Sequence, residues 1–452
     1  MAADKPTSGD GSMVFLLQRE FSAIERRDVI LAITLGVVVM VVSVLRIEVS
    51  REAISVNNCV LGADTVSIWR YLEEGNFLGL RVHKHALAVV LIALLAQPLI
   101  WLGISQALAA TLALSLVQAC AAVLAFAYFR RAGNTKAVSA GLTLLVLSTL
   151  GVATHFGMAE SYGVTLLAIC IACLLLPVVA EKARQDALVS ASVAGAIGAG
   201  LALANAPAAA FLLVYFACLL KQAEVVADLR KFALCILVPL AFVLLAVVAP
   251  AVAAEGDDGL VWHGDYLERF ASFSHFIDPQ VLADFLATSF VFSFVAPYEF
   301  LRCRFIFADL LQFGARPLHL AAYLAMASLL VVSLVRAVRS SERTETFGLL
   351  AAASAILLFY LYFNPDEALL YSPQWLIALF FASAPGVPRM AIWVWLAAVL
   401  GLLVNVPTLH HEKTSDPEVC CPHPPGSMME RELPSVLIRE GSRHNTRGGA
   451  GQ

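Results

Sequence analysis

The sequence predicts an all-helical protein that crosses a membrane many times, on the evidence of its composition, its apolar runs and the placement of its basic residues. Apolar residues make up 60% of the 452 positions and charged residues 14%, with a mean hydropathy of +0.80. A soluble domain carries about 25% charged residues. This chain has too few to cover a water-exposed surface, which excludes a soluble enzyme. No basic block exceeds a pair of arginines, so nothing indicates nucleic-acid binding.

Long apolar segments supply the predicted membrane-spanning helices. A helix needs about 20 mostly apolar residues to cross the hydrocarbon region. Arg26 and Arg27 directly precede the first such segment. Because Lys and Arg gather on the cytoplasmic side, this pair predicts a cytoplasmic N-terminus over residues 1–28. The segments near the required length are 29–46, 86–104, 106–128, 137–153, 162–180, 188–204, 206–220, 232–253, 318–338, 347–363, 371–385 and 389–408.

The segment 86–104 decides the topology. If it does not cross, most basic residues between the later segments collect on the inner side. The short outer connections then carry no Lys or Arg: 155–161, 205–206 and 364–370. This asymmetry is typical of membrane proteins. We therefore predict about 11 spans, with 86–104 lying in the outer interface or re-entering and with Arg130 on the cytoplasmic side.

Two outer connections are long enough to hold structure of their own, 47–105 and 254–317. The second is rich in aromatic residues, and both suit an amphipathic helix at the membrane interface. We therefore expect interfacial helices in the first and fourth outer loops. The predicted organisation is a cytoplasmic N-terminus over 1–28, a catalytic core over 29–220, a C-terminal helical half over 221–409 and a disordered Pro-, Gly- and charge-rich tail over 410–452.

Asp64 is the most informative acid of the first outer loop. It lies roughly 18 residues beyond the end of the first apolar segment. A carboxylate in this place could act as a general base that removes a proton from an acceptor hydroxyl or amine. Asp is also a favoured residue at the start of a helix, so Asp64 could instead cap a helix over 65–71. Both roles are compatible with the sequence.

Basic residues stand directly before the segment 86–104. Three follow one another in the sequence: His83, Lys84 and His85. They could neutralise a phosphate in a lipid headgroup, with Lys84 as a point charge. The alternatives are a polar flank that reaches the interface, or two metal-ligating histidines. No clear further ligand lies nearby, so we assign no metal site.

Charged residues in two other outer connections complete the candidate site. Glu160 lies in a short turn at the membrane face, where an acid is costly unless it is solvated or paired. It could bind an acceptor or a cation, or it could be a solvated residue near a helix N-terminus. Arg302 and Arg304 in the connection 254–317 could hold a lipid phosphate from the opposite side.

The order of these parts resembles the GT-C glycosyltransferases, in particular the branch of the family 39 protein mannosyltransferases and the aminoarabinose transferases. Members have an acid early in the first outer loop, then aromatic residues, a glycine and a basic start to an interfacial helix. The matching residues are Asp64, Trp69, Tyr71, Gly75 and Lys84-His85-Ala86-Leu87. The chain departs from the pattern at Thr65, where a second acid is expected, and at Ala86, where a proline is expected. We expect no counterpart of the large soluble C-terminal domain of some members.

The resemblance implies a glycosyltransferase of the plasma or inner membrane with its active site on the non-cytoplasmic face. The donor would be a polyprenyl-phosphate-linked sugar and the acceptor a lipid, a glycan or a protein. Asp64 would be the base, Glu160 would help to place the acceptor, and His83, Lys84, His85, Arg302 and Arg304 would bind the donor. No cofactor follows from the sequence, and a divalent metal stays open.

A transporter or polymerase of lipids or polysaccharides, without this transfer chemistry, is the alternative. An ion-coupled transporter places ionisable residues near the middle of its spans. The middle of nearly every predicted span here is free of charge, which favours the transferase.

Overall fold

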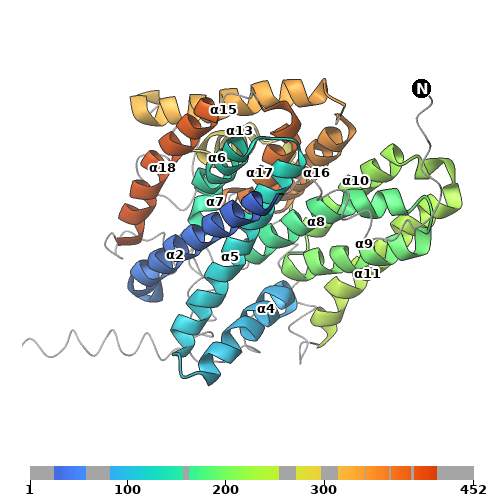
Figure 1. Cartoon of the computed structure of the whole chain (residues 1–452), viewed down its shortest axis with the longest axis horizontal. Helices are drawn as coiled ribbons and strands as arrows, with labels where there is room; N and C mark the ends of the chain where they lie inside the picture. The colour runs from blue at the N-terminus through green and yellow to red at the C-terminus, as the bar shows by residue number, and fades with distance from the viewer. Residues whose placement is uncertain are drawn as a thin grey trace, which may run out of the picture.

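The computed structural model is helical throughout the part of the chain that it describes (Figure 1). The described residues are 25–56, 82–155, 162–253, 271–296, 314–341, 343–365, 368–387 and 391–414. The elements follow in the order α2 (Arg26–Val56), α4 (Val82–Trp101), α5 (Gln106–Arg131), α6 (Lys136–Ser148), α7 (Leu150–His155), α8 (Tyr162–Lys182), α9 (Ala187–Ala204), α10 (Ala208–Gln222), η1 (Val225–Ala227), α11 (Leu229–Ala253), η2 (Phe273–Phe276), α13 (Pro279–Ala287), η3 (Thr288–Phe292), α15 (Pro317–Val338), α16 (Arg343–Phe363), α17 (Ala368–Ser383), η5 (Ala384–Gly386) and α18 (Ala391–Thr414).

Eight of the described helices are long and apolar enough to cross a membrane. They are α2, α5, α8, α9, α11, α15, α16 and α18. The prediction of an all-helical, multi-pass membrane protein is thereby confirmed. Length alone does not reach the predicted count of about 11, because α6, α10 and α17 are each shorter than a full span.

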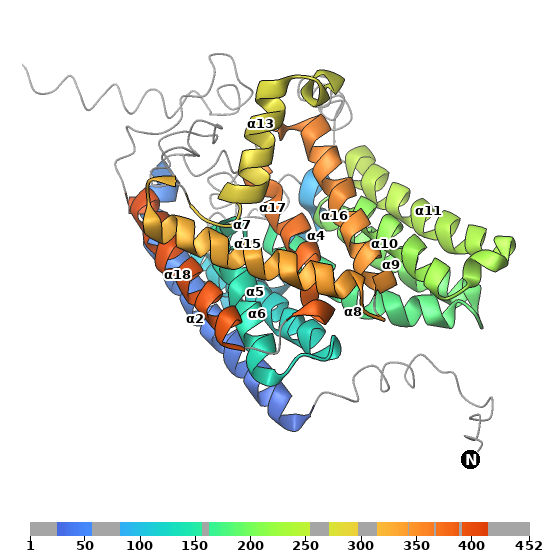
Figure 2. The ribbon, with the colours of Figure 1, turned by 90° about the horizontal axis from the view of Figure 1, so that it is seen from above.

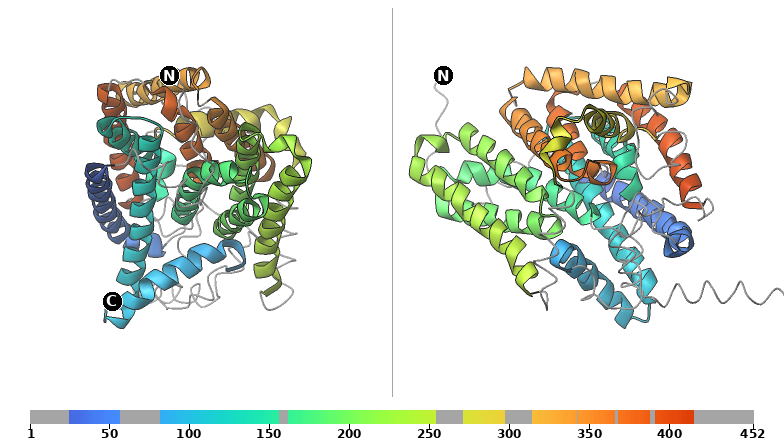
Figure 3. Two further views of the ribbon diagram at one scale, coloured as in Figure 1. Left: turned by 45° about the vertical axis from the view of Figure 1, so that its right-hand side comes forward. Right: turned by 180° about the vertical axis from the view of Figure 1, so that it is seen from behind.

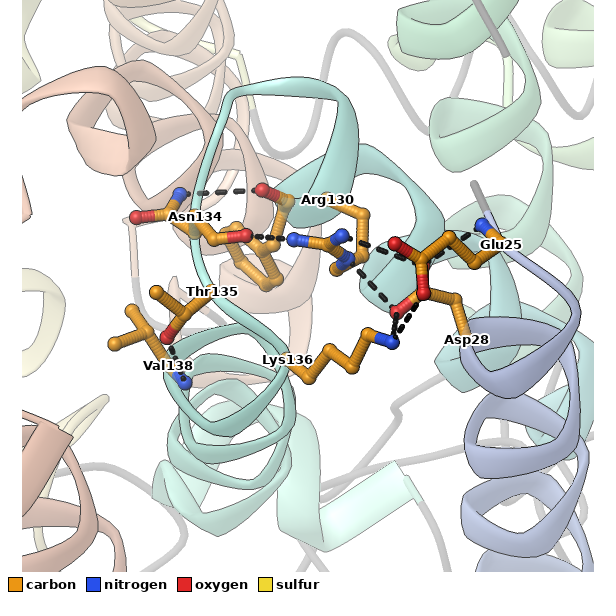
Figure 4. Close-up of polar contacts among 8 residues, drawn as sticks. Glu25, Asp28, Arg130, Asn134, Thr135, Lys136 and Val138 are labelled. Atoms are coloured by element: carbon orange, nitrogen blue, oxygen red, sulfur yellow. Dashed lines mark hydrogen bonds and ion pairs between the residues drawn. The ribbon is translucent and has the colours of Figure 1, made fainter. Parts of the chain in front are cut away.

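One end of the bundle is held by ion pairs, and we call it the basic end (Figure 4). Arg130 near the end of α5 binds Asp28 near the start of α2, with Nε to Oδ1 at 3.0 Å and Nη2 to Oδ2 at 3.2 Å. Lys136 at the start of α6 binds Glu25 at 2.8 Å. The start of α2, the end of α5 and the start of α6 therefore lie together.

The opposite end, the distal end, contains the end of α2 and the start of α5. Thr111 in the second turn of α5 donates to Glu48 of α2, at 3.0 Å from Oγ1 to Oε1. Ile47 packs in one cluster with Ala109 and Ala110. The helices α2 and α5 are consequently antiparallel neighbours, each running from one end of the bundle to the other.

Helix α4 begins and ends without taking the chain to the basic end. Ile92 and Ala96 pack on the first turns of α5, while Ala88 packs against Val117 in the middle of α5. Figures 1 and 3 show α4 at the edge of the assembly. Its neighbours in the chain, the end of α2 and the start of α5, both lie at the distal end. The expectation that 86–104 does not cross the membrane stays a prediction.

The apolar segment predicted as one span over 137–153 is broken at Thr149, between α6 and α7. Ser148 and Thr149 each turn their hydroxyl back onto a backbone carbonyl, at 2.8 and 2.7 Å, which offers the backbone an alternative to the continuing helix. Position 151 needs a glycine because α17 approaches its backbone closely. A Cβ at this position would lie 1.8 Å from the hydroxyl oxygen of Ser372.

The connection 254–317 also differs in part from the prediction of an interfacial helix. Its described part starts with the exposed turn η2 and continues through α13 into a turn of π-helix, η3. Figure 2 shows α13 reaching the middle of the assembly beside α7 and α17. Phe292, Val295 and Ala296 are fully buried. The described residues from Phe292 to Ala296 are therefore part of the core instead of lying on its surface.

Candidate functional site

The residues predicted to form the site lie at the border of what the structure describes. Four of them lie outside the described residues: Asp64, Glu160, Arg302 and Arg304. Three lie in the first turn of α4, where the backbone but not the side chains is described: His83, Lys84 and His85. Their roles stay predictions.

The described part of the distal end contains a buried polar network. Ser43 of α2 donates its hydroxyl to Oε1 of Gln118 in α5. Nε2 of Gln118 donates to the carbonyl of His155, at 2.8 Å. Arg46, one turn after Ser43, donates from Nη1 to the carbonyl of Ala153, also at 2.8 Å. Two helices thus direct polar side chains at the last residues of α7.

The network continues through aromatic rings. The ring of His155 lies 4.8 Å from that of Tyr162 at the start of α8, and Tyr162 meets the edge of Tyr371 in α17 at 5.9 Å. Tyr371 stacks on Tyr360 of α16 with centroids 3.9 Å apart. The Tyr360 hydroxyl accepts from Nε2 of Gln374, at 2.9 Å. All five side chains are buried.

We call these eight residues the distal polar cluster: Ser43, Arg46, Gln118, His155, Tyr162, Tyr360, Tyr371 and Gln374. They come from α2, α5, α7, α8, α16 and α17, and the cluster therefore joins the first and second halves of the chain. Its groups are a guanidinium, an imidazole, phenols and amides, which suit phosphate and hydroxyl groups. Glu48, which accepts from Thr111, follows Arg46 two positions later on α2.

The cluster is joined along the chain to the predicted site residues. His155 and Tyr162 flank the segment 156–161, which carries Glu160. Arg46 lies on α2, and the connection that follows α2 carries Asp64. A sequence signal for the cluster existed: Arg46, Gln118 and His155 each interrupt or end an apolar run. Polar residues in spans are costly and are often functional.

The polar groups at the basic end are arranged differently. Glu345 of α16 accepts on Oε1 from the hydroxyls of Tyr128 and Tyr215, both at 2.9 Å, and from the guanidinium of Arg131. Outside the spans, the ammonium of Lys136 donates to Glu25 and lowers the pKa of that carboxyl. Glu345 and Glu25 each have a basic partner, which indicates a structural role.

A metal centre would need several ligands in one place. The part of the chain that the structure describes contains no group of three or more His, Cys, Asp or Glu side chains placed to hold a metal ion. Cys170 and Cys173, spaced as a C-x-x-C, are buried within the apolar helix α8 as free thiols. A metal role for the described residues therefore has no support.

No protein-family model, no curated protein and no solved structure matches this chain.

Proposed function

We propose that this protein is a membrane glycosyltransferase that takes a sugar from a polyprenyl-phosphate donor and passes it to an acceptor at the distal end. The distal polar cluster is the observation that supports this proposal best. It gathers Arg46, His155 and three tyrosines at the end of the bundle from which the connections with Asp64 and Glu160 leave. Such groups suit a phosphate and a hydroxyl-rich ring at a membrane surface.

We further propose eleven spans, made of the eight long helices together with α6–α7, α10 and α17. Contacts at the helix ends support the alternation. Val164 near the start of α8 and Ala204 at the end of α9 share a distal cluster with Ala88. The residue after α10, Ala223, accepts from Arg184, which follows α8, at 2.6 Å. Helices α8 and α10 thus end on one side, and α9 returns between them.

The second half follows the same alternation. Glu345 at the start of α16 lies with Arg131 at the basic end, and Asn134 donates to the carbonyl of Ala384 after α17, at 3.0 Å. Trp395 near the start of α18 donates to Ala137, at 3.1 Å. Basic residues on these connections support a cytoplasmic basic end and a distal end on the outer side.

The proposed reaction is a displacement at the sugar carbon bonded to the donor phosphate. Asp64 takes the proton of an acceptor hydroxyl or amine, whose lone pair forms the new bond to that carbon. The bond from carbon to the phosphate oxygen breaks, and its electron pair leaves with polyprenyl phosphate. The configuration at the carbon inverts. Lys84 and either Arg302 or Arg304 stabilise the charge on the leaving phosphate, and Glu160 places the acceptor.

Release of polyprenyl phosphate tests the proposal, because this product is the same for every sugar and acceptor. Purified protein in nanodiscs would be incubated with a panel of polyprenyl- and dolichyl-phosphate sugars together with lipid, glycan and peptide acceptors, and the freed lipid phosphate quantified by mass spectrometry. We expect release from at least one donor. No release from any donor, together with movement of a labelled lipid or glycan across proteoliposomes, would favour the transporter.

Asp64→Asn tests the proposed base. We expect a loss of about 10²–10⁴-fold in release with the fold intact, because Asn caps a helix as well as Asp but accepts no proton. Asp186→Asn is the matched control. Asp186 caps α9 at the basic end, where Oδ1 accepts from the amide of Val189 at 3.0 Å. Equal rates in the two variants would show that Asp64 only caps a helix.

A further inference from the structure

Asn405 of α18 holds three backbone groups with one fully buried side chain. Nδ2 donates to the carbonyl of Ser148 at 2.6 Å and to that of Phe294 at 2.8 Å. Oδ1 accepts from the amide of Ala296, at 2.7 Å. Both donors and the acceptor of the amide are thereby used. The side chain joins the end of α6 to the buried segment that follows η3.

The same segment also closes the helix break. The amide of Leu150 donates to the carbonyl of Phe294 at 3.1 Å, and the amide of Gly151 donates to that of Ser293 at 2.9 Å. These N–H groups open the short helix α7 and have no carbonyl of a preceding turn to bind. Irregular backbone at membrane depth is stable only when buried protein groups satisfy it.

Helix α7 links the backbone held by Asn405 to the distal polar cluster. It has only six residues, from Leu150 to His155. Its first amides are held beside Asn405, and its last carbonyls, those of Ala153 and His155, accept from Arg46 and Gln118. A shift at the start of so short a helix moves its end, because the hydrogen-bonded turns of a helix are stiff.

We infer that Asn405 is a positioning residue, which sets α7 and through it Arg46 and Gln118 of the distal polar cluster. This role rests on the proposed function, in which the distal polar cluster binds the donor. Asn suits the position through its chemistry: two donors and one acceptor match two carbonyls and one amide. Leu has a similar size but provides none of these bonds.

Asn405→Leu and Asn134→Leu form a matched pair for the test. Asn134 is a clamp at the basic end, where Nδ2 donates to the carbonyls of Phe129 and Ala384, at 3.2 and 3.0 Å. Hydrogen exchange at the amides of Leu150 and Gly151 would be measured in nanodiscs, with release kinetics for the donor. We expect Asn405→Leu to speed both amides and to raise the donor KM about tenfold with little change in kcat.

Asn134→Leu should lower thermal stability without changing the two amides or the KM. Asn405→Asp is the second variant if Asn405→Leu does not fold, because it keeps the bond from Ala296 and changes only the two donor contacts. Unchanged exchange at Leu150 and Gly151 in a folded Asn405 variant would overturn the inference, and so would an equal rise in KM for both clamps. Hydrogen exchange needs no substrate. It therefore tests whether Asn405 holds the start of α7 even if wild-type protein releases no lipid phosphate.

Discussion

The two ends of the bundle satisfy their buried polar groups in different ways. At the basic end, acids meet bases: Asp28 binds Arg130, and Glu345 binds Arg131. At the distal end, side chains bind the main chain, as Arg46 and Gln118 bind carbonyls of α7. Charges that neutralise each other in an ion pair fix the ends of helices, and few of their groups remain to bind or activate a substrate. Side chains that bind a broken helix couple its position to their own, which suits a site.

The comparison predicts that damage at the basic end will appear mainly as lost stability. Arg130→Ala should lower the free energy of unfolding by about 3–5 kcal/mol, because the carboxylate of Asp28 then stays buried without its bidentate partner. Unfolding in bicelles would measure this loss. The double variant Arg130→Met with Asp28→Leu should recover most of it. A full loss in the double variant would show that the charges are not the cause.

Gly151→Ala at the helix break should destabilise the protein by about 1–3 kcal/mol, the range for overpacking a core. The added methyl group would meet the hydroxyl of Ser372. Ser372→Gly removes that hydroxyl and should restore both stability and release of polyprenyl phosphate when combined with Gly151→Ala. If the pair is no better than Gly151→Ala alone, the close approach of α17 is not what selects glycine.

Gln118→Met sharpens the comparison at the distal polar cluster. It removes the bonds to Ser43 and to the carbonyl of His155, and we expect a loss of about 1–2 kcal/mol in stability. Release of lipid phosphate should fall below that of a variant with an equal loss of stability. Thr346→Val is the control, because it removes a bond to Ala382 of similar burial at the basic end. The control should keep full activity at a similar stability.

The smallest effect concerns pH. The hydrogen bond and charge of Lys136 lower the pKa of Glu25 below its ordinary value of 4.5. A carboxyl whose pKa is lower in the folded state stabilises that state above its ordinary pKa, and this contribution disappears as the pH falls through the folded value. Glu25→Gln should remove a weak pH dependence below about pH 4.5, measured as the shift in Tm. A slope unchanged by Glu25→Gln would assign it to other acids.

The sequence was sufficient for the class of the protein and for the neighbourhood of its basic residues. Apolar length depends on local composition, and so does the Lys and Arg asymmetry, whose sidedness stays a prediction. The contact between Arg130 and Asp28 brings the end of α5 to the start of α2. The helix break was not predictable in this way. Its hydrogen-bond partners, Phe294 and Asn405, are distant in the chain, and no apolar pattern marks such long-range pairs.

The candidate site was predictable only in outline. Asp64 and Glu160 stood out because charged residues are rare between apolar segments, and their roles stay predictions. Arg46 was counted as the end of a span, and Gln118 as part of one, although each binds a carbonyl of α7. Only the fold brings these residues together, because they lie on separate helices that are antiparallel.

The break between α6 and α7 also has a consequence for how the chain is synthesised. In the proposed topology, Ser148 enters the membrane 257 positions before Asn405, its partner in α18. Until the ribosome has made that span, the exposed amides and carbonyls at the break lie in lipid without their final partners, which lipid cannot replace. During biogenesis these backbone groups therefore need other hydrogen-bond partners, from the insertion machinery or from water in its pore. Truncation before Asn405 should leave a nascent chain that quality control degrades.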